Sequence, residues 1–415
     1  MRVIAKQNNY SEKSLDALCI ILWFNGSLMS AVWIFMNKLF HVSYEVSHSL
    51  LMPLIVVALI MASLSAMKKR LNSLLLSIFF TFLIIFILSY LIHPTNPAFE
   101  ELGVFSYCFL ILPYLFLGSF FDITRIKRII YLLSIVVVIK NTLFLFVFNN
   151  NTTADMIEGG GEYMSAAYSL LPSVLILFWY ALDTHKLFNI ALSLYSLFLL
   201  LAYGNRGSVL CVVLFVLLYF GYHNIKKLKI WQISFVLVGV GIVIRYLDEI
   251  LVFFQLILGS LGLSTRFFDM IEGGVDEDAS SQGRLYYYSK ALKALDSENF
   301  MGLGMAGDRI PLNGAYSHNI IVESIVSYGY VFGSLFLLLL FLLVFFAFRK
   351  AKDYDEVIFL FVLMCIGLIP LFISGSYVDE ILFYLFIGYC TFIVTKRKTV
   401  SYAQNSYTKQ KVLSW

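Results

Sequence analysis

Long apolar runs separated by short polar breaks dominate the chain. Each run is roughly 20 residues long, the length that an α-helix needs to cross the hydrocarbon core of a bilayer. About twelve such runs can be placed along the sequence, each predicting one membrane-spanning helix. They cover residues 15–36, 48–67, 72–92, 103–121, 128–148, 163–182, 187–203, 207–223, 230–246, 318–348, 356–374 and 379–395. The pattern therefore predicts an all-α, polytopic integral membrane protein in which residues 1–415 form a single transmembrane domain.

One interruption is much longer than the others. Residues 247–317 separate two predicted spans, whereas most connections run about four to six residues and long ones are often functional. Within it, residues 247–263 are apolar enough to lie on the membrane face, and Arg284–Leu295 reads as an amphipathic helix that contains three consecutive tyrosines. We therefore expect a long external loop that carries short helices, folds back over the membrane surface and contributes to function.

The composition agrees with this membrane class. Hydrophobic residues make up 60% of the chain and charged residues 13%, whereas soluble domains are roughly a quarter charged. The first apolar run follows Ser14 without a small-residue cleavage site, so we expect a retained span rather than a signal peptide. The five cysteines lie inside predicted spans at unrelated spacings, which fits neither a disulfide framework nor a metal site.

The placement of basic residues predicts the orientation. If both termini are cytoplasmic, 21 of the 30 Lys and Arg residues fall in the loops on the cytoplasmic side. This bias is the one that inner loops of membrane proteins show. The long loop 247–317 then lies on the outer side of the membrane.

Arg206 is one of the few basic residues on that outer side. It sits in the polar break Gly204–Ser208, whose glycines let a ligand approach the backbone closely. A guanidinium there can make a bidentate, charge-assisted contact with a phosphate. The alternative is an interfacial arginine that reaches toward lipid headgroups.

Three further arginines belong to the long loop. Arg284 opens the predicted amphipathic helix, where the helix N-terminus would add backbone donors to an anion site. The alternative is an ion pair with the acidic residues 276–278 of the same loop. Arg266 and Arg309 are weaker candidates for anion binding, with the same alternative.

His318 has the most suggestive setting of the six histidines. It lies in Tyr316–Asn319, directly before a predicted span that contains Glu323. A neutral imidazole near pH 7 can accept the proton of a sugar hydroxyl as a general base, although an ordinary interfacial histidine is the alternative. Glu323 is costly in or near the membrane unless it is partnered, so it either orients His318 or holds the loop. The other histidines have no spacing suited to a metal.

Several function classes find no support in the sequence. It contains no Walker-type phosphate loop, dinucleotide fingerprint, Gly-x-Ser-x-Gly elbow or nucleic-acid motif. We therefore expect no metal, no cofactor and no nucleic-acid partner. Lipid-phase chemistry or transport is what remains.

Three segments within residues 200–335, taken in order, resemble the family of bacterial O-antigen polymerases and O-antigen ligases. They are Tyr203–Ser208 before a span, Gln282–Arg284 followed by Phe300–Gly304, and Tyr316–Asn319 followed by Glu323, Gly329 and Gly333. The match departs from the family pattern at Asn205 and Gly207, and at Phe300, where the family often has Asn-Pro before Gly-x-Gly.

The resemblance implies a metal-independent glycosyltransferase of the bacterial inner membrane, with its active site facing the periplasm. An acceptor sugar hydroxyl attacks the anomeric carbon of an undecaprenyl-diphosphate-linked glycan, and undecaprenyl diphosphate leaves. On this reading Arg206 and Arg284 clamp the diphosphate and His318 assists the hydroxyl, so these three are the expected catalytic residues. The other residues expected to contact substrate are Arg266, Arg309, Tyr287, Asn319 and Glu323.

The identity of the acceptor separates two members of that family. A polymerase transfers the glycan to the non-reducing end of another lipid-linked repeat, whereas a ligase transfers it to lipid A core. The segment Gly204–Ser208 and the Phe- and Tyr-rich spans resemble polymerases more closely, which points to lipopolysaccharide biosynthesis. The partners implied are the lipid-linked oligosaccharide, the bilayer and a chain-length regulator protein.

A transporter, such as a flippase for the same lipid-linked oligosaccharide, is the alternative from another class. Such a protein should carry charges deep within several spans to line an aqueous path. Only Lys140, Arg245 and Glu323 come near that description. A scaffold role would leave the two arginines and the histidine without a joint purpose.

Overall fold

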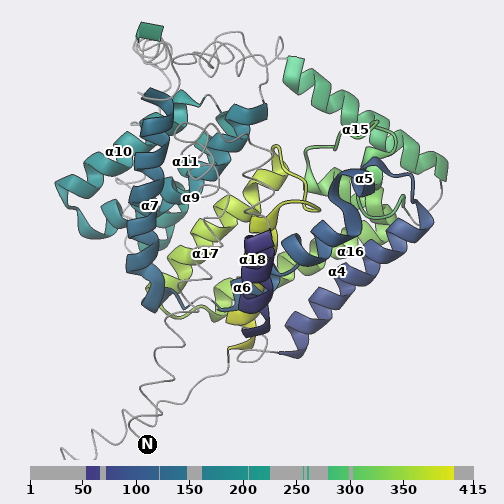
Figure 1. Ribbon diagram of the computed structural model, residues 1–415, viewed down its shortest axis with the longest axis horizontal. Coiled ribbons are helices and arrows are strands. Elements are labelled where there is room, and N and C mark those ends of the chain that lie inside the picture. The colour runs from purple at the N-terminus through teal and green to yellow at the C-terminus, as the bar shows by residue number, and fades with distance from the viewer. Residues whose placement is uncertain are drawn as a thin grey trace, which may run out of the picture.

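The computed structural model describes residues 53–65, 72–120, 122–146, 161–203, 205–224, 256, 259–260, 279–298 and 302–396. Throughout these ranges the regular structure is helical, and no strand occurs among them. The α-helices are Pro53–Ser65, α4 (Ser73–Ile92), α5 (Pro97–Ser106), α6 (Tyr114–Phe120), α7 (Ile123–Phe146), α9 (Gly161–Thr184), α10 (Leu187–Ala202), α11 (Arg206–Asn224), α15 (Ala279–Glu298), α16 (Ile320–Lys350), α17 (Tyr354–Gly367) and α18 (Ile381–Thr395). A π-helical turn, Tyr107–Ile111, joins α5 to α6, and short 3₁₀ helices form at Gly307–Arg309 and Ile369–Phe372. Figure 1 shows the helices gathered around α18.

Every predicted span that falls on described residues is occupied by a helix. Among the described residues, five helices are long and apolar enough to cross a membrane, namely Ser73–Ile92, Ile126–Leu145, Ala166–Thr184, Ile320–Lys350 and Tyr354–Phe372. Shorter apolar helices are Pro53–Ser65, Gly103–Ser119, Leu187–Ala202, Gly207–His223 and Ile381–Thr395. The predicted spans 15–36 and 230–246 lie outside the described residues. The described part is thus compatible with a polytopic membrane protein, while twelve crossings stay a prediction.

Helix α18 lies at the centre because glycines let neighbouring backbones touch it. A Cβ atom on Gly388 would lie 2.1 Å from the carbonyl oxygen of Leu115, and one on Gly118 would lie 2.0 Å from that of Leu385. Gly367 brings α17 almost as close on another side. Small residues allow such close packing where the bilayer provides no hydrophobic force between helices. Most side chains of α18 are accordingly buried.

Helix α16 is kinked, where the sequence predicted one uninterrupted apolar helix. Gly329 has φ 74° and ψ 169°, a left-handed conformation that glycine adopts without a steric penalty. The kink frees carbonyl groups of the preceding turn for other donors. The N–H groups of Leu303 and Gly304 donate to the carbonyl oxygens of Val326 and Ser327, each at 2.9 Å. Beyond the kink, about 30 Å of helix remains, which is enough to cross a bilayer.

A cluster of charges and hydroxyls joins four helices at one end of the bundle. Lys127, near the start of α7, lies 3.0 Å from the carboxylate of Asp183 and 2.7 Å from that of Asp355. The hydroxyls of Tyr219 and Tyr354 donate to Asp183 at 3.0 and 2.7 Å. We name these five residues the Lys127 cluster. It ties the end of α9 to α11 and to the start of α17.

Candidate active site

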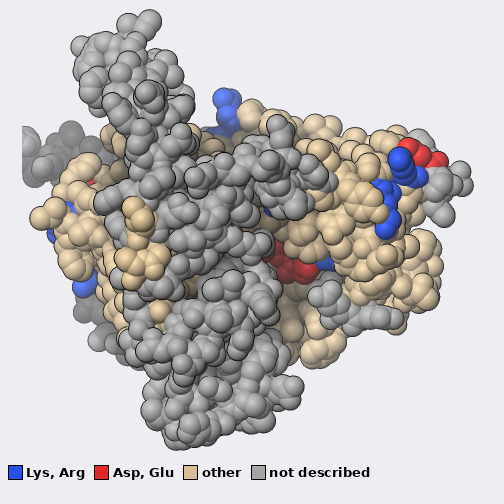
Figure 2. All heavy atoms as spheres, turned by 90° about the horizontal axis from the view of Figure 1, so that it is seen from above, with Lys and Arg blue, Asp and Glu red and all other residues tan. Residues whose placement is uncertain are grey.

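The opposite end of the bundle gathers loops and helix starts around His318. Tyr168 lies fifteen residues before Asp183 on α9, so the two ends are about 22 Å apart along that helix. At this end α15 lies over the first part of α16 (Figure 1). Seen from above, acidic side chains with a few basic atoms beside them lie near the middle of the view, next to a surface of other residues (Figure 2). The polar side chains at this end come from loops and helix starts rather than from the middle of helices.

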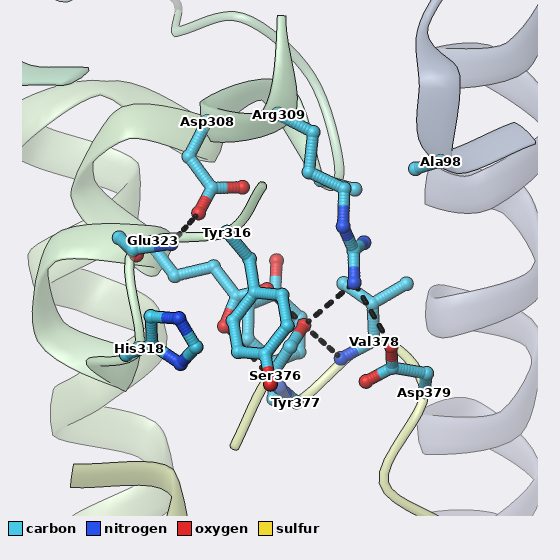
Figure 3. A network of polar contacts seen from close by, with 12 residues as sticks. Ala98, Asp308, Arg309, Tyr316, His318, Glu323, Ser376, Tyr377, Val378 and Asp379 are labelled. Atoms are coloured by element: carbon cyan, nitrogen blue, oxygen red, sulfur yellow. Dashed lines mark hydrogen bonds and ion pairs between the residues drawn. The ribbon is translucent and has the colours of Figure 1, made fainter. Parts of the chain in front are cut away.

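His318 projects from a strained turn just before α16. Its φ is 56°, in the left-handed region that residues other than glycine rarely adopt and that is enriched at functional sites. Its Nδ1 lies 3.1 Å from the carbonyl oxygen of Ser374, and the hydroxyl of Tyr316 donates to the same oxygen at 2.9 Å. Figure 3 shows His318 and Tyr316 side by side. Because a carbonyl only accepts, Nδ1 carries the proton, and Nε2 of the neutral ring is the acceptor.

The surroundings keep this ring neutral. Burial lowers the pKa of His318, and the positive charge of Arg284 lowers it further. The hydrogen bond to the Ser374 carbonyl and the negative charge of Asp308 act in the opposite direction without reversing the shift. Since an ordinary histidine titrates near pH 6.5, His318 is unprotonated at pH 7. A neutral imidazole with Nε2 as acceptor can take the proton of a hydroxyl.

Helix α15 brings Arg284 and Tyr287 to this histidine. The ring centroid of Tyr287 lies 6.3 Å from that of His318, and Arg284 is close enough for its charge to act on the same ring. None of the ion pairs found between described residues involves Arg284. The acidic residues 276–278, the alternative partners, lie outside the described residues. Arg284 therefore stands near the site as a cation with no carboxylate partner in the described part of the chain.

The start of α15 differs from the prediction that Arg284 opens the helix. Residues 284–295 are helical as predicted, but α15 begins at Ala279, more than a turn earlier. The Ser- and Gly-containing segment before Arg284 is part of the helix, although serine and glycine have weak helix propensity. The unpaired N–H groups of the first turn therefore belong to the residues from Ala279 onward. Arg284 contributes its guanidinium and not a helix N-terminus.

Ser374, in the segment after α17, links His318 to helices α9 and α11. Its Oγ lies 2.6 Å from the hydroxyl oxygen of Tyr168. Gly207 lies directly against that hydroxyl, since a Cβ atom there would be 2.3 Å from it. Arg206 is the first residue of α11, and its side chain is not among those described. The backbone that bears Arg206 is thus placed near Tyr168, which contacts Ser374 and through it His318.

Arg309 lies in the buried support of the site. It is only 2% exposed, and its Nη2 donates to Asp379 at 2.9 Å and to Ser376 at 3.4 Å (Figure 3). Its guanidinium lies 5.5 Å from the ring centroid of Tyr316. The ion-pair partner Asp379 lies 70 residues farther along the chain, and the acidic residues 276–278 of the same loop lie outside the described residues. These contacts assign Arg309 to holding two loops together, while a contact with substrate stays a prediction.

Glu323 binds the segment after α17. Its carboxylate accepts a hydrogen bond from the hydroxyl of Ser376 and another from the N–H of Tyr377, the latter at 3.2 Å. Of its two expected roles, holding a loop is the one that these contacts show; His318 is instead held by a carbonyl. Because Glu323 precedes the kink at Gly329, it does not lie in the long apolar part of α16.

The other two predicted substrate residues have different outcomes. Asn319 is the N-cap of α16, and its Oδ1 accepts a hydrogen bond from the N–H of Ile321 at 2.9 Å. Such a cap satisfies a backbone donor that the helix leaves open. Arg266 lies outside the described residues.

Sequence reasoning missed three residues that shape the site. Ser374 belongs to Ser374–Ser376, a polar break between apolar runs that resembles the break around Arg206 and carried a usable signal. Tyr168 carried none, because one tyrosine in an apolar run is common. Asp308 is fully buried, and burial raises the pKa of its carboxyl. It accepts the N–H of Ser317 at 2.7 Å and so holds the backbone next to His318.

The described residues contain no group of three or more His, Cys, Asp or Glu side chains arranged to hold a metal ion. What this end of the bundle offers is acid–base and electrostatic chemistry: a neutral imidazole, a nearby guanidinium and aromatic faces. No family model and no curated protein sequence matches this chain.

Proposed function

We propose that this chain is a membrane glycosyltransferase that polymerises a surface polysaccharide from undecaprenyl-diphosphate-linked repeat units. The observation that carries the proposal is His318, held as a neutral base beside Arg284, at the end of a bundle of apolar helices. A lipid-linked donor requires its reacting carbon at the membrane surface, and the loops at this end of the bundle suit that position.

The proposed reaction needs only side chains of the type found here. The acceptor hydroxyl attacks the anomeric carbon of the donor, and its proton passes to Nε2 of His318. The bond between the anomeric carbon and the diphosphate oxygen breaks, and undecaprenyl diphosphate leaves with the bonding electrons. Arg284 and Arg206 stabilise the negative charge that develops on the leaving diphosphate, as preorganised cations do in many transfer reactions. Tyr287 offers a ring face to a sugar next to the base.

The contacts of Glu323 weigh against the transporter alternative. This carboxylate bonds a loop serine and a loop N–H rather than lining a path between helices. Of the other two charged residues that could line such a path, Arg245 lies outside the described residues. Lys140 lies well within the described span Ile126–Leu145. One lysine does not make a polar route across a bilayer.

A periplasmic site in the bacterial inner membrane, with both termini cytoplasmic, belongs to the same proposal. The Lys127 cluster lies at the end of the bundle that the positive-inside rule assigns to the cytoplasm. The polymerase is preferred over the ligase only on the resemblance of Gly204–Ser208 and of the Phe- and Tyr-rich spans to polymerases, so the test must separate the two.

The test is complementation of a polymerase-deficient strain with wild type and with Arg206→Ala, Arg284→Ala and His318→Ala at matched expression. The lipopolysaccharide is read as a ladder on a gel. We expect wild type to restore the ladder and each variant to lose it while single-repeat lipopolysaccharide remains. The matched control is Lys290→Ala, another basic residue of α15, which lies over the ring of Tyr286 at 5.8 Å and should leave the ladder intact.

Two other outcomes would overturn the polymerase. If a ligase-deficient strain carries no attached repeats and the wild-type chain restores them, the chain is a ligase. If the ladder is unaffected by all three substitutions, the transporter or scaffold alternatives return.

A further inference from the structure

We propose that Tyr168 is a positioning residue for the transfer, because its hydroxyl holds the base His318 and the backbone of Arg206 in register through Ser374. This inference rests on the proposed function and adds a residue that no sequence motif pointed to. Tyr168 touches no reacting atom in this scheme; it acts through its neighbours.

The first contact ties Tyr168 to the base. Its hydroxyl oxygen lies 2.6 Å from Oγ of Ser374, and the carbonyl of the same serine receives the Nδ1 proton of His318. Tyr316 donates to that carbonyl as well. The orientation of the imidazole, and therefore the direction of Nε2, depends on where this one residue of the segment after α17 is held.

The second contact ties Tyr168 to α11. A Cβ atom on Gly207 would lie 2.3 Å from the Tyr168 hydroxyl, well below any normal contact distance, and 3.3 Å from Cγ2 of Ile373. The tyrosine hydroxyl therefore occupies the space that a side chain at this position would need. The first turn of α11 rests on it, and Arg206 is the residue immediately before Gly207.

The two contacts share one oxygen atom. Any movement of the Tyr168 ring changes the position of the Ser374 carbonyl and of the α11 start together. The base and one of the two proposed diphosphate-binding arginines thus depend on a common support, whereas the other arginine, Arg284, comes from α15. A side chain at 207 would collide with the Tyr168 hydroxyl, so this arrangement requires a glycine there.

A double-mutant cycle tests the inference with purified full-length chain in nanodiscs and a lipid-diphosphate-linked repeat unit as substrate. Gly207→Ala should lower kcat about a hundredfold, because its Cβ collides with the hydroxyl, and Tyr168→Phe should lower kcat about tenfold. The double variant should be about tenfold more active than Gly207→Ala, since removing the hydroxyl oxygen opens the space. Losses that simply multiply in the double variant would overturn the proposal.

A second variant guards against a Gly207→Ala chain that does not fold. Ser374→Ala removes the same hydrogen bond from the other side without adding bulk. It should lower kcat about as much as Tyr168→Phe, with KM nearly unchanged, and combining the two should cost no more than either alone. An additive loss would count against the shared support.

The pH profile separates positioning from a general loss of stability. The hydrogen bond to the Ser374 carbonyl raises the pKa of His318, so loosening it should move the acid limb of kcat to lower pH in Tyr168→Phe. Arg284 of α15 and Asp308 of the preceding loop also act on this ring and are unchanged in the variant. The control is Tyr131→Phe, which loses a 2.7 Å hydrogen bond to Asn189 near the Lys127 cluster and should leave the limb in place. An unmoved limb in Tyr168→Phe would contradict the proposal.

Failure of the proposed function is distinguishable from failure of this inference. A wild-type chain that transfers no glycan refutes the function. An active wild type whose variants show no coupling refutes only the role of Tyr168.

Discussion

The His318 and Lys127 ends of the bundle both concentrate polar side chains, but they differ in how completely those side chains satisfy one another. In the Lys127 cluster the lysine has two carboxylate partners and lies 4.3 Å from the ring centroid of Trp179. The hydroxyls of Tyr219 and Tyr354 donate hydrogen bonds to the carboxylate of Asp183. At the other end, His318 has a strained backbone and an acceptor nitrogen, and Arg284 has no carboxylate partner among the described residues.

The difference follows from the elements that supply the residues. The Lys127 cluster comes from helix ends whose positions are set by packing, so its ammonium contacts two carboxylates and two tyrosine hydroxyls bond one of them. The His318 end is built by loops, where the non-glycine residues Ala306, Asn313 and His318 have positive φ values. Strain of this kind persists only when surrounding contacts hold it. A compensated cluster stabilises the fold, whereas an uncompensated one on a rigid support is available for chemistry.

Lys127→Met should have the largest effect on stability. Removing the ammonium leaves Asp183 and Asp355 facing each other without a cation, and since all three side chains are partly exposed we expect a loss of about 2 kcal/mol. Thermal unfolding in detergent measures this, and activity per folded molecule should be unchanged. The matched control is Lys290→Met, a lysine of α15 without an ion pair in the described part of the chain. Loss of activity in a fully folded Lys127→Met chain would contradict the assignment of the Lys127 cluster to stability rather than to chemistry.

Arg284→Gln should move the pH dependence of transfer. The positive charge of Arg284 lowers the pKa of His318, so its removal raises that pKa and shifts the acid limb of kcat to higher pH. Burial of His318 remains the larger cause of its lowered pKa and is unchanged in this variant. Arg284→Lys keeps the charge and should keep the limb where it is in wild type. If the acid limb of kcat moves as far in Arg284→Lys as in Arg284→Gln, the positive charge at this position is not the cause of the shift.

Asn319→Ser should have the smallest effect and sharpens the assignment of this residue. Serine caps a helix nearly as well as asparagine, so the loss of stability should be under about 0.5 kcal/mol. If Asn319 serves only as the N-cap of α16, transfer activity should also persist. A large rise in KM with unchanged stability would instead support the predicted contact with substrate.

Much of the architecture could be predicted from local patterns. Apolar runs of spanning length became helices wherever the structure describes them, because burying backbone groups in an apolar medium leaves helix formation as the local solution. Residues 284–295 of the long loop are helical as their amphipathic pattern predicted. The kink in α16 was missed, although Gly329 was noted, since a single glycine does not reveal that another loop will supply donors to the carbonyls it frees.

The partners of the polar residues could not be read in the same way. Arg309 was expected to contact substrate, with pairing to acids of its own loop as the alternative, and the structure adds an ion pair with Asp379 from the segment before α18. The sequence left two roles open for Glu323, orienting His318 or holding the loop. Only the fold shows that Ser376 and Tyr377 donate to its carboxylate. Hydropathy reports the environment of each residue separately, whereas these contacts depend on how distant segments approach.

The sequence by itself determined that this chain forms apolar helices of membrane-crossing length and that its unusual polar breaks lie at their ends, because both depend on the local cost of placing polar groups in hydrocarbon. Only the tertiary structure decided that Tyr168, Ser374 and His318 form one connected set. Their sequence separations are large, and a hydrogen bond over 2.6 or 3.1 Å exists only once several helices have packed to within a fraction of an ångström.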